Sequence, residues 1–304
     1  MNDNRRSEGA KNLRSFFDDQ LHHLQILVSS LGHHGRAEDE ALLTADDKRV
    51  IENFVDAANS KMRAADDYVE KLRDHVCALY RHILSVADQI PEPVDLNHDA
   101  FRSNPLVNAL FVNAADIDRL FKTNADTDAY FRVHSQCQMP VVYALLTACK
   151  TEKSILGIGM LGEMLVRDVS QQSVNFSSHK LHTPCASHAE LNMALKKYLF
   201  DRIVALIKQE MASCIAAQAC NVGDHAYESR LKSLANPEVY LSTLNDYLAI
   251  PAKLLRIDTA HFKLNKLGIK LADEDRQCAN EFDIHELIWA DNTRNIVLKI
   301  AYIR

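Results

Sequence analysis

The chain has 304 residues, 47% of them hydrophobic and 25% charged, which is typical of a globular protein of one or two domains. Its net charge of −6 excludes a broad basic surface for nucleic acid, so we expect no nucleic-acid partner. Seven cysteines without a CxxC pair favour a reducing compartment. No signal peptide is evident and no apolar run of about 18 residues is found, so the sequence predicts a cytoplasmic protein without a membrane span.

The first 92 residues carry the strongest pattern of the chain, an apolar residue at alternating steps of four and three. Residues 9–31 follow it first, and a longer segment from 51 to 90 follows it without any Pro or Gly. The positions of the longer stripe are Ile51, Val55, Ala58, Met62, Ala65, Val69, Leu72, Val76, Leu79, Ile83, Val86 and Ile90. Because such a repeat keeps one apolar seam on one side of a helix, the sequence predicts a long antiparallel, coiled-coil-like helical hairpin over residues 1–92.

The second half of the stripe, residues 69–90, is richer in large side chains than the first half. The shorter helix over residues 9–31 is long enough to cover only the first half. The seam proper consists of Val69, Leu72, Val76, Leu79, Ile83 and Val86. Two interpretations stay open: the seam packs on the rest of this chain, or it binds a second copy or another protein.

Residues 93–304 predict a mixed domain with an antiparallel sheet and packed helices. Apolar runs at about 140–177 read as a meander of short strands, and β-rich segments at about 253–303 complete the sheet, with a hairpin turn at 291–294. Helices occupy about 187–248, where Ser187 and Glu190 form a capping box and Asn236-Pro237 begins a second helix. The expected fold class is therefore α+β and predominantly helical, with the hairpin of residues 1–92 in front.

Three glycines, Gly157, Gly159 and Gly162, match the GxGxxG pattern of nucleotide-binding loops. Arg167 and Asp168 follow closely and supply charge for a ligand. Such a site needs a strand before the glycines, a helix after them and an acidic residue on the next strand, and this acidic residue is missing. The alternative is that the glycines lie within strands, where a bulge or a closely packed neighbour requires them.

Four potential metal ligands, His179, His182, Cys185 and His188, lie within ten residues. Imidazole and thiolate are ligands that zinc prefers, and a closed structural site needs four of them. The spacing matches no established zinc motif, so the alternative is that these side chains belong to a loop and a helix start. Zinc is the only cofactor that the sequence suggests, and the expectation favours none.

Three functions follow from these patterns. The favoured one is a non-enzymatic interaction or assembly protein that associates with itself or with a partner through the seam at residues 69–90. The first alternative is an enzyme or sensor that binds a nucleotide-like ligand at residues 157–168, and the second is a metal-binding protein centred on residues 179–188. Because the sequence has no GxSxG, P-loop or HExxH motif, the catalytic residues are unknown and an enzyme is disfavoured.

Overall fold

The structure is a computed structural model that describes residues 45–133, 141–161, 164–220, 236–272 and 279–303. The chain divides into two compact units, each built from two segments. The helical unit contains Met1–Ala87 and Met193–Leu255, and the sheet unit contains Asp88–Asn192 and Arg256–Arg304. None of the helices in the described residues is long and apolar enough to cross a membrane. Whether residues 93–304 fold as a domain of their own stays a prediction.

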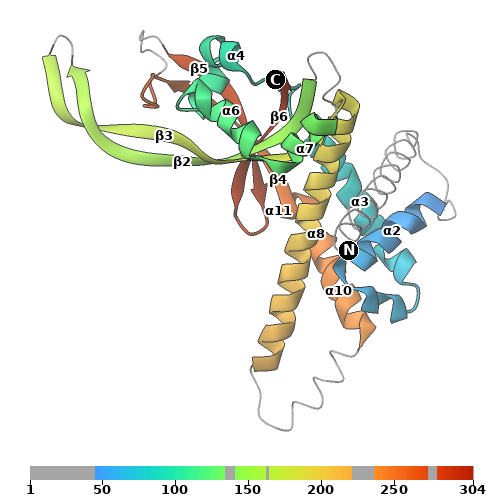
Figure 1. Ribbon diagram of the computed structural model, residues 1–304. Helices are drawn as coiled ribbons and strands as arrows, with labels where there is room; N and C mark the ends of the chain where they lie inside the picture. Colours follow the sequence, from blue (N-terminus) through green and yellow to red (C-terminus); the bar gives the residue numbers. More distant parts are fainter. Residues whose placement is uncertain (1–44, 134–140, 162–163, 221–235, 273–278, 304) are drawn as a thin grey trace, which may run out of the picture. The chain divides into compact units, whose positions relative to one another are not determined.

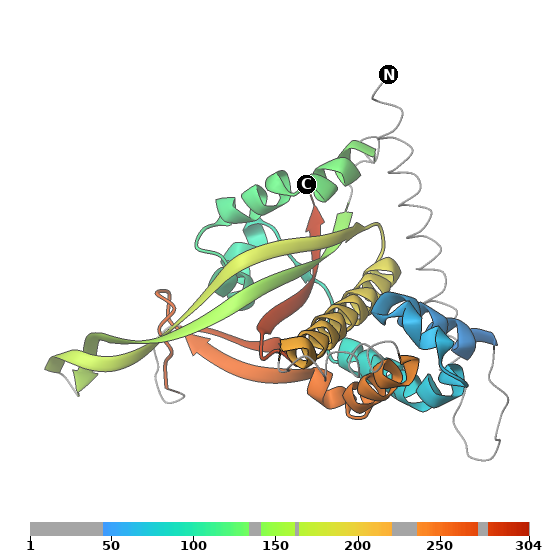
Figure 2. The ribbon, with the colours of Figure 1, turned by 90° about the horizontal axis from the view of Figure 1, so that it is seen from below.

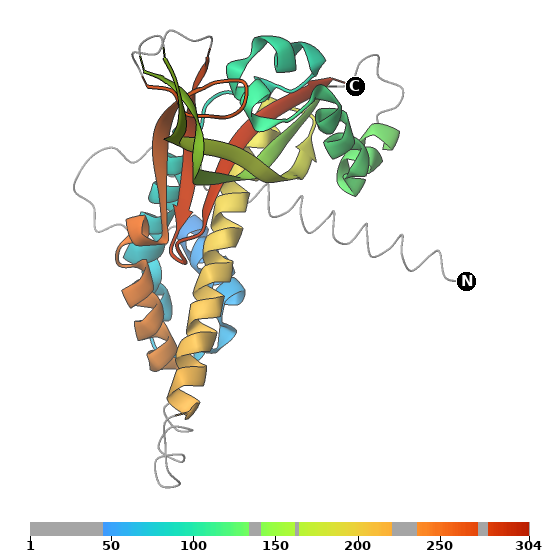
Figure 3. The ribbon, with the colours of Figure 1, turned by 90° about the vertical axis from the view of Figure 1, so that its left-hand side faces the viewer.

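The helices of the helical unit lie side by side (Figure 3), and aromatic side chains pack between them. Its elements are α2 (Ala45–Ala58), the 3-10 helix η1 (Ser60–Ala64), α3 (Tyr68–Asp88), α8 (His188–Cys220, in this unit from Met193), α10 (Pro237–Leu248) and α11 (Pro251–Leu254). The Phe200 ring on α8 contacts Phe54 of α2 and Tyr80 of α3, with ring centroids 5.9 and 5.3 Å apart. The predicted cap of α10 is present, since the Asn236 side chain accepts a hydrogen bond from the amide of Glu238.

The fold class predicted from the sequence is wrong, because the described residues contain no long N-terminal helical hairpin. The stripe at residues 51–90 does not form one helix: α2 ends at Ala58, and α3 begins only at Tyr68. Between them, Asn59 is extended and accepts a hydrogen bond from the amide of Lys61, and Asp67 has a φ of +54°. Residues 9–31, the other half of the predicted hairpin, lie outside the described residues.

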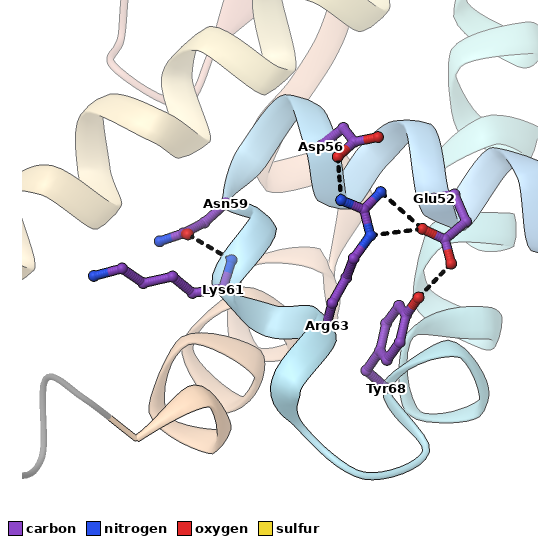
Figure 4. Close-up of polar contacts among 6 residues, drawn as sticks. All are labelled: Glu52, Asp56, Asn59, Lys61, Arg63 and Tyr68. Atoms are coloured by element: carbon purple, nitrogen blue, oxygen red, sulfur yellow. Dashed lines mark hydrogen bonds and ion pairs between the residues drawn. The ribbon is translucent and has the colours of Figure 1, made fainter.

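Polar contacts among Glu52, Asp56, Arg63 and Tyr68, which we call the clasp, connect the two sides of the turn between α2 and α3 (Figure 4). The Arg63 guanidinium donates to Glu52 at 2.9 Å and forms an ion pair with Asp56 at 2.5 Å, and the Tyr68 hydroxyl donates to the other oxygen of Glu52. The Tyr68 hydrogen bond, followed by the Arg63 hydrogen bond, holds the pKa of Glu52 below its ordinary value. The clasp therefore fixes a turn that the apolar stripe does not reveal.

Replacing Tyr68 by phenylalanine is expected to destabilise the helical unit by about 1 kcal/mol at pH 7, the value of one hydrogen bond to a partly exposed charge. Because the folded-state pKa of Glu52 is lowered, its contribution is complete above the ordinary pKa of a glutamate and disappears as the pH falls through the lowered value. Urea unfolding followed by circular dichroism at neutral and acid pH should show the deficit shrinking with acid. A deficit independent of pH would contradict the role given to Glu52.

The sheet unit is built on a six-stranded sheet with the order β3-β2-β6-β5-β4, and β1 pairs with β6. The strands are β1 (Val94–Asp95), β2 (Val141–Leu161), β3 (Met164–Cys185), β4 (Leu255–Leu264), β5 (Asn280–Trp289) and β6 (Arg294–Ile303). The pairings of β2 with β3, of β2 with β6 and of β5 with β6 are antiparallel, whereas β1 runs parallel to β6. The hairpin turn predicted at 291–294 is present between β5 and β6, with Asn292 at a φ of +61°.

Four short helices cover one face of this sheet (Figure 2). They are α4 (His98–Ser103), α5 (Pro105–Leu110), α6 (Ala114–Thr123) and α7 (Ala125–Val133). Each follows an asparagine whose side chain accepts a hydrogen bond from an amide of the first turn: Asn97, Asn104, Asn113 and Asn124. Alternate residues of β2 and β6, from Val142 to Ala148 and from Ile296 to Tyr302, pack against these helices and form the core.

The predicted meander of short strands is instead one pair of long strands. Lys150 to Lys153, which separate two of the apolar runs in the sequence, lie inside β2, as do Gly157 and Gly159. The cross-strand partners of β3 supply the pairing that local propensity does not reveal.

Candidate interaction surface on the β2–β3 arm

The long strands β2 and β3 extend beyond the rest of the sheet as a two-stranded arm (Figure 1). Strand β6 pairs with β2 only from Val141 to Ala148, whereas β2 and β3 pair with each other as far as Leu161 and Met164. The loop at residues 265–272 contacts β3 once more, since Val174 donates to the Gly268 carbonyl and Lys270 to the Gln172 carbonyl, each at 2.8 Å. We call the part beyond this contact, residues 154–161 and 164–171, the arm tip.

Three bulges on β3 curve the β2–β3 pair, and the one at Asp168 lies in the arm tip. At three places two consecutive paired positions are separated by one more residue on β3 than on β2. At each place one of the unpaired β3 residues has a positive φ: Asp168 (+61°), Ser178 (+56°) and Thr183 (+46°). A bulge bends its strand and increases the local twist. It also interrupts the row of free amides and carbonyls along a sheet edge, which hinders edge-to-edge association with another strand.

The arm tip exposes a cluster of large apolar side chains. Their exposed fractions range from 38% to 74%, and they are Ile155, Leu156, Ile158, Met164 and Leu165. A two-stranded ribbon has no second layer to cover its faces, so these side chains have no core of their own to enter. The strand register places Leu156, Ile158 and Leu165 on one face of the ribbon and Ile155 and Met164 on the other. Exposed apolar residues are ordinary when they are single, but several of them close together on one face mark a contact surface.

A groove of about 650 Å³ lies beside this cluster, between the arm and the loop at residues 265–272. Its apolar lining includes Ile158 and Leu165 from the arm and Leu271 from the loop, and its polar lining includes Gln171 and Lys270. The arm tip therefore offers both protruding apolar side chains and an open recess next to them.

The glycines of the GxGxxG match lie in this arm. Gly157 and Gly159 are in β2, and Gly162 lies outside the described residues. A Cβ at Gly157 would overlap the side-chain oxygen of Gln171, whose amide nitrogen donates to the Ile158 carbonyl, and a Cβ at Gly159 would lie 3.1 Å from Val169. The glycines thus leave room for side chains of the opposite strand.

A nucleotide site of the predicted kind would need a helix after these glycines. Strand β3 follows instead, and Arg167 and Asp168 lie exposed on it. The site would therefore lack the helix N-terminus that binds a pyrophosphate.

The four predicted zinc ligands make four separate contacts. The His179 ring stacks on Phe111 with centroids 4.7 Å apart, and a His182 ring nitrogen lies 2.9 Å from the Thr147 hydroxyl. The Cys185 thiol donates to the Thr183 carbonyl, and His188 lies 2.9 Å from Glu92.

In the part of the chain that the structure describes, no three His, Cys, Asp or Glu side chains are grouped as metal ligands. Burial raises the pKa of Cys185 to about 12, so its thiol stays protonated at neutral pH. A zinc ligand would have to be the thiolate, so this environment disfavours metal binding by Cys185.

The seam at residues 69–90 belongs to the core of the chain itself. Five of its six side chains, Leu72, Val76, Leu79, Ile83 and Val86, are at most 2% exposed, and Val69 is half-buried. Beside them Tyr80 stacks on Phe200, and a ring nitrogen of His82 lies 2.6 Å from the Leu255 carbonyl, both contacts within the helical unit. A partner could reach the seam only if α3 left this core.

Sequence reasoning missed the arm tip. The run from Ile155 to Leu161 read as one short strand of a meander within the sheet, and nothing in it indicates that it extends beyond the sheet. A signal was available: Gly162-Glu163 separates two β-prone runs and is typical of a hairpin. Comparisons with known families, with curated proteins and with solved structures found no match for the chain.

Proposed function

We propose that this protein is a non-enzymatic interaction or assembly protein and that it contacts its partner through the arm tip. The observation that carries this proposal is the cluster of five exposed apolar side chains on a two-stranded arm. Water-exposed apolar surface of this extent is costly unless a partner covers it. The seam of α3 offers no comparable surface, because its side chains are buried.

The proposal places the protein in the cytoplasm. In the described residues, Cys77, Cys149 and Cys185 are not paired in disulfides, which suits a reducing compartment.

The arm tip should determine the size of the complex that contains this chain in cells. We expect the wild-type chain to migrate in native extracts above the mass of a single copy. The double variant Leu156→Ser, Leu165→Ser is expected to migrate as a single copy, because each leucine loses about 1.5–3 kcal/mol of apolar burial at an interface. Native size separation of extracts from cells that are crosslinked before lysis, with detection of this chain, measures both.

The control for this experiment is Val112→Ser. Val112 is 86% exposed but lies outside the arm, so it tests removal of one exposed apolar side chain elsewhere in the same unit. A wild-type chain that migrates as a single copy, or an arm variant that keeps its large complex, would refute the proposed function.

A further inference from the structure

We propose that the partner of the arm tip is a second copy of this chain and that two tips pack face to face around a twofold axis. This inference rests on the proposed function and names its partner.

A twofold contact places one patch against the same patch of the other copy, so the patch must match itself. Besides the arm tip, the large hydrophobic side chains exposed in the described residues are Val112, Ile250, Leu267 and Ile303. Val112, Ile250 and Ile303 are isolated in separate segments, and Leu267 lies in the loop that pairs with β3. Within the described residues, the apolar surface best able to match one arm tip is therefore another arm tip.

The area of the patch suits a dimer of modest strength. Leu156, Ile158 and Leu165 lie on one face of the ribbon, and together with the exposed Arg167 and Asp168 of the bulge opposite Ile158 they present roughly 500 Å² per copy. Two tips together would bury about 1,000 Å², which is the lower limit for a specific interface. We therefore expect a dimer that dissociates at low micromolar concentrations.

The charges among these side chains fit a twofold contact. Arg167 and Asp168 are adjacent, exposed and of opposite sign, and neither has an ion-pair partner in the described part of the chain. Near a twofold axis, Arg167 of one copy meets Asp168 of the other, and the same pair forms a second time. A patch that carries both signs side by side is thus complementary to itself.

The bulge at Asp168 determines that two arm tips associate through their faces and not through their strand edges. Its extra residue interrupts the outer edge of β3, so two β3 edges cannot form a regular ladder there. The copies should therefore associate through the side chains on their faces, with the protruding Leu165 of one copy beside the groove of the other.

The first test measures the mass of the purified full chain by analytical ultracentrifugation from about 0.1 to 100 μM. We expect an equilibrium between monomer and dimer, and Leu165→Asp is expected to raise the dissociation constant at least 100-fold, because the change occurs twice in each dimer. Val112→Asp, the matched control, should leave the constant unchanged.

The second test reverses the charges. Arg167→Asp is expected to weaken the dimer about tenfold, because the new carboxylate would face Asp168 of the other copy, and adding Asp168→Lys should restore most of the affinity. The exposed Arg102 on α4 provides the control Arg102→Asp, which should have no effect. Thermal unfolding of each variant verifies that the positive φ at residue 168 still tolerates the change.

A purified chain that stays monomeric over the whole concentration range would overturn the inference, as would a dimer insensitive to Leu165→Asp. The same holds if the arm-dependent complex in cell extracts contains a different protein instead of a second copy, or if the monomer binds phospholipid vesicles through the arm tip. With a different protein, the proposed function stands and only the twofold pairing fails. A single-copy chain in both extracts and purified samples refutes both.

Discussion

Replacing Gly268 by alanine is expected to destabilise the sheet unit by about 2–3 kcal/mol. Gly268 has a φ of +74°, a conformation that costs an alanine about 1–2 kcal/mol. An added Cβ would also lie 2.7 Å from the carbonyl oxygen of Val174, whose amide donates to the Gly268 carbonyl. Because this oxygen is backbone, either the loop or β3 must move, and their hydrogen bonds weaken.

The control is Gly157→Ala. There the added Cβ would meet the end of the flexible Gln171 side chain, which can turn away, and the expected loss is below about 1 kcal/mol. Urea unfolding followed by fluorescence suits both variants, because the single tryptophan of the chain, Trp289, is buried in β5 of the same unit. Equal losses at both positions would contradict the difference between backbone and side-chain contact on which this prediction rests.

The apolar stripe at residues 51–90 identified buried positions without identifying their helices. Met62 and Ala65 are buried as predicted from the pattern, although they lie in η1 and the turn after it. Asn59 and Asp67 form this turn, because short polar side chains compete with helical hydrogen bonds even where no proline or glycine is present. Heptad periodicity reports burial, and the clasp between Glu52 and Arg63 decides where the helix stops.

The arm illustrates the opposite problem, in which the strands were recognisable but their exposure was not. A run such as Ile155 to Leu161 is apolar whether it lies in a core or on an arm, and which of these applies depends on where β6 begins, more than a hundred residues later. Capping signals at Ser187 and Asn236 were reliable because each acts within four residues. Predictions that depend on local chemistry therefore held where those that depend on distant strand pairing did not.

Replacing Lys150 by methionine is expected to destabilise the sheet unit by about 3 kcal/mol, because it leaves a buried carboxylate without its closest cation. The Lys150 ammonium lies 3.3 Å from Glu286 and 3.0 Å from Glu152, at the point where β2 leaves β6 and the arm begins. The Glu286 side chain is only 5% exposed, and its other cation, Arg294, is 3.6 Å away and half-exposed.

The double variant Lys150→Met, Glu286→Leu should recover most of this loss, since a buried ion pair replaced by apolar side chains of similar size is often neutral in stability. Arg132→Met is the matched control: it removes a cation from the exposed pair with Asp128 and should cost less than about 1 kcal/mol. Urea unfolding measured by Trp289 fluorescence gives all three values. A double variant as unstable as Lys150→Met would mean that Lys150 acts through its packing on the Phe262 ring, 5.1 Å from the ammonium, and not through Glu286.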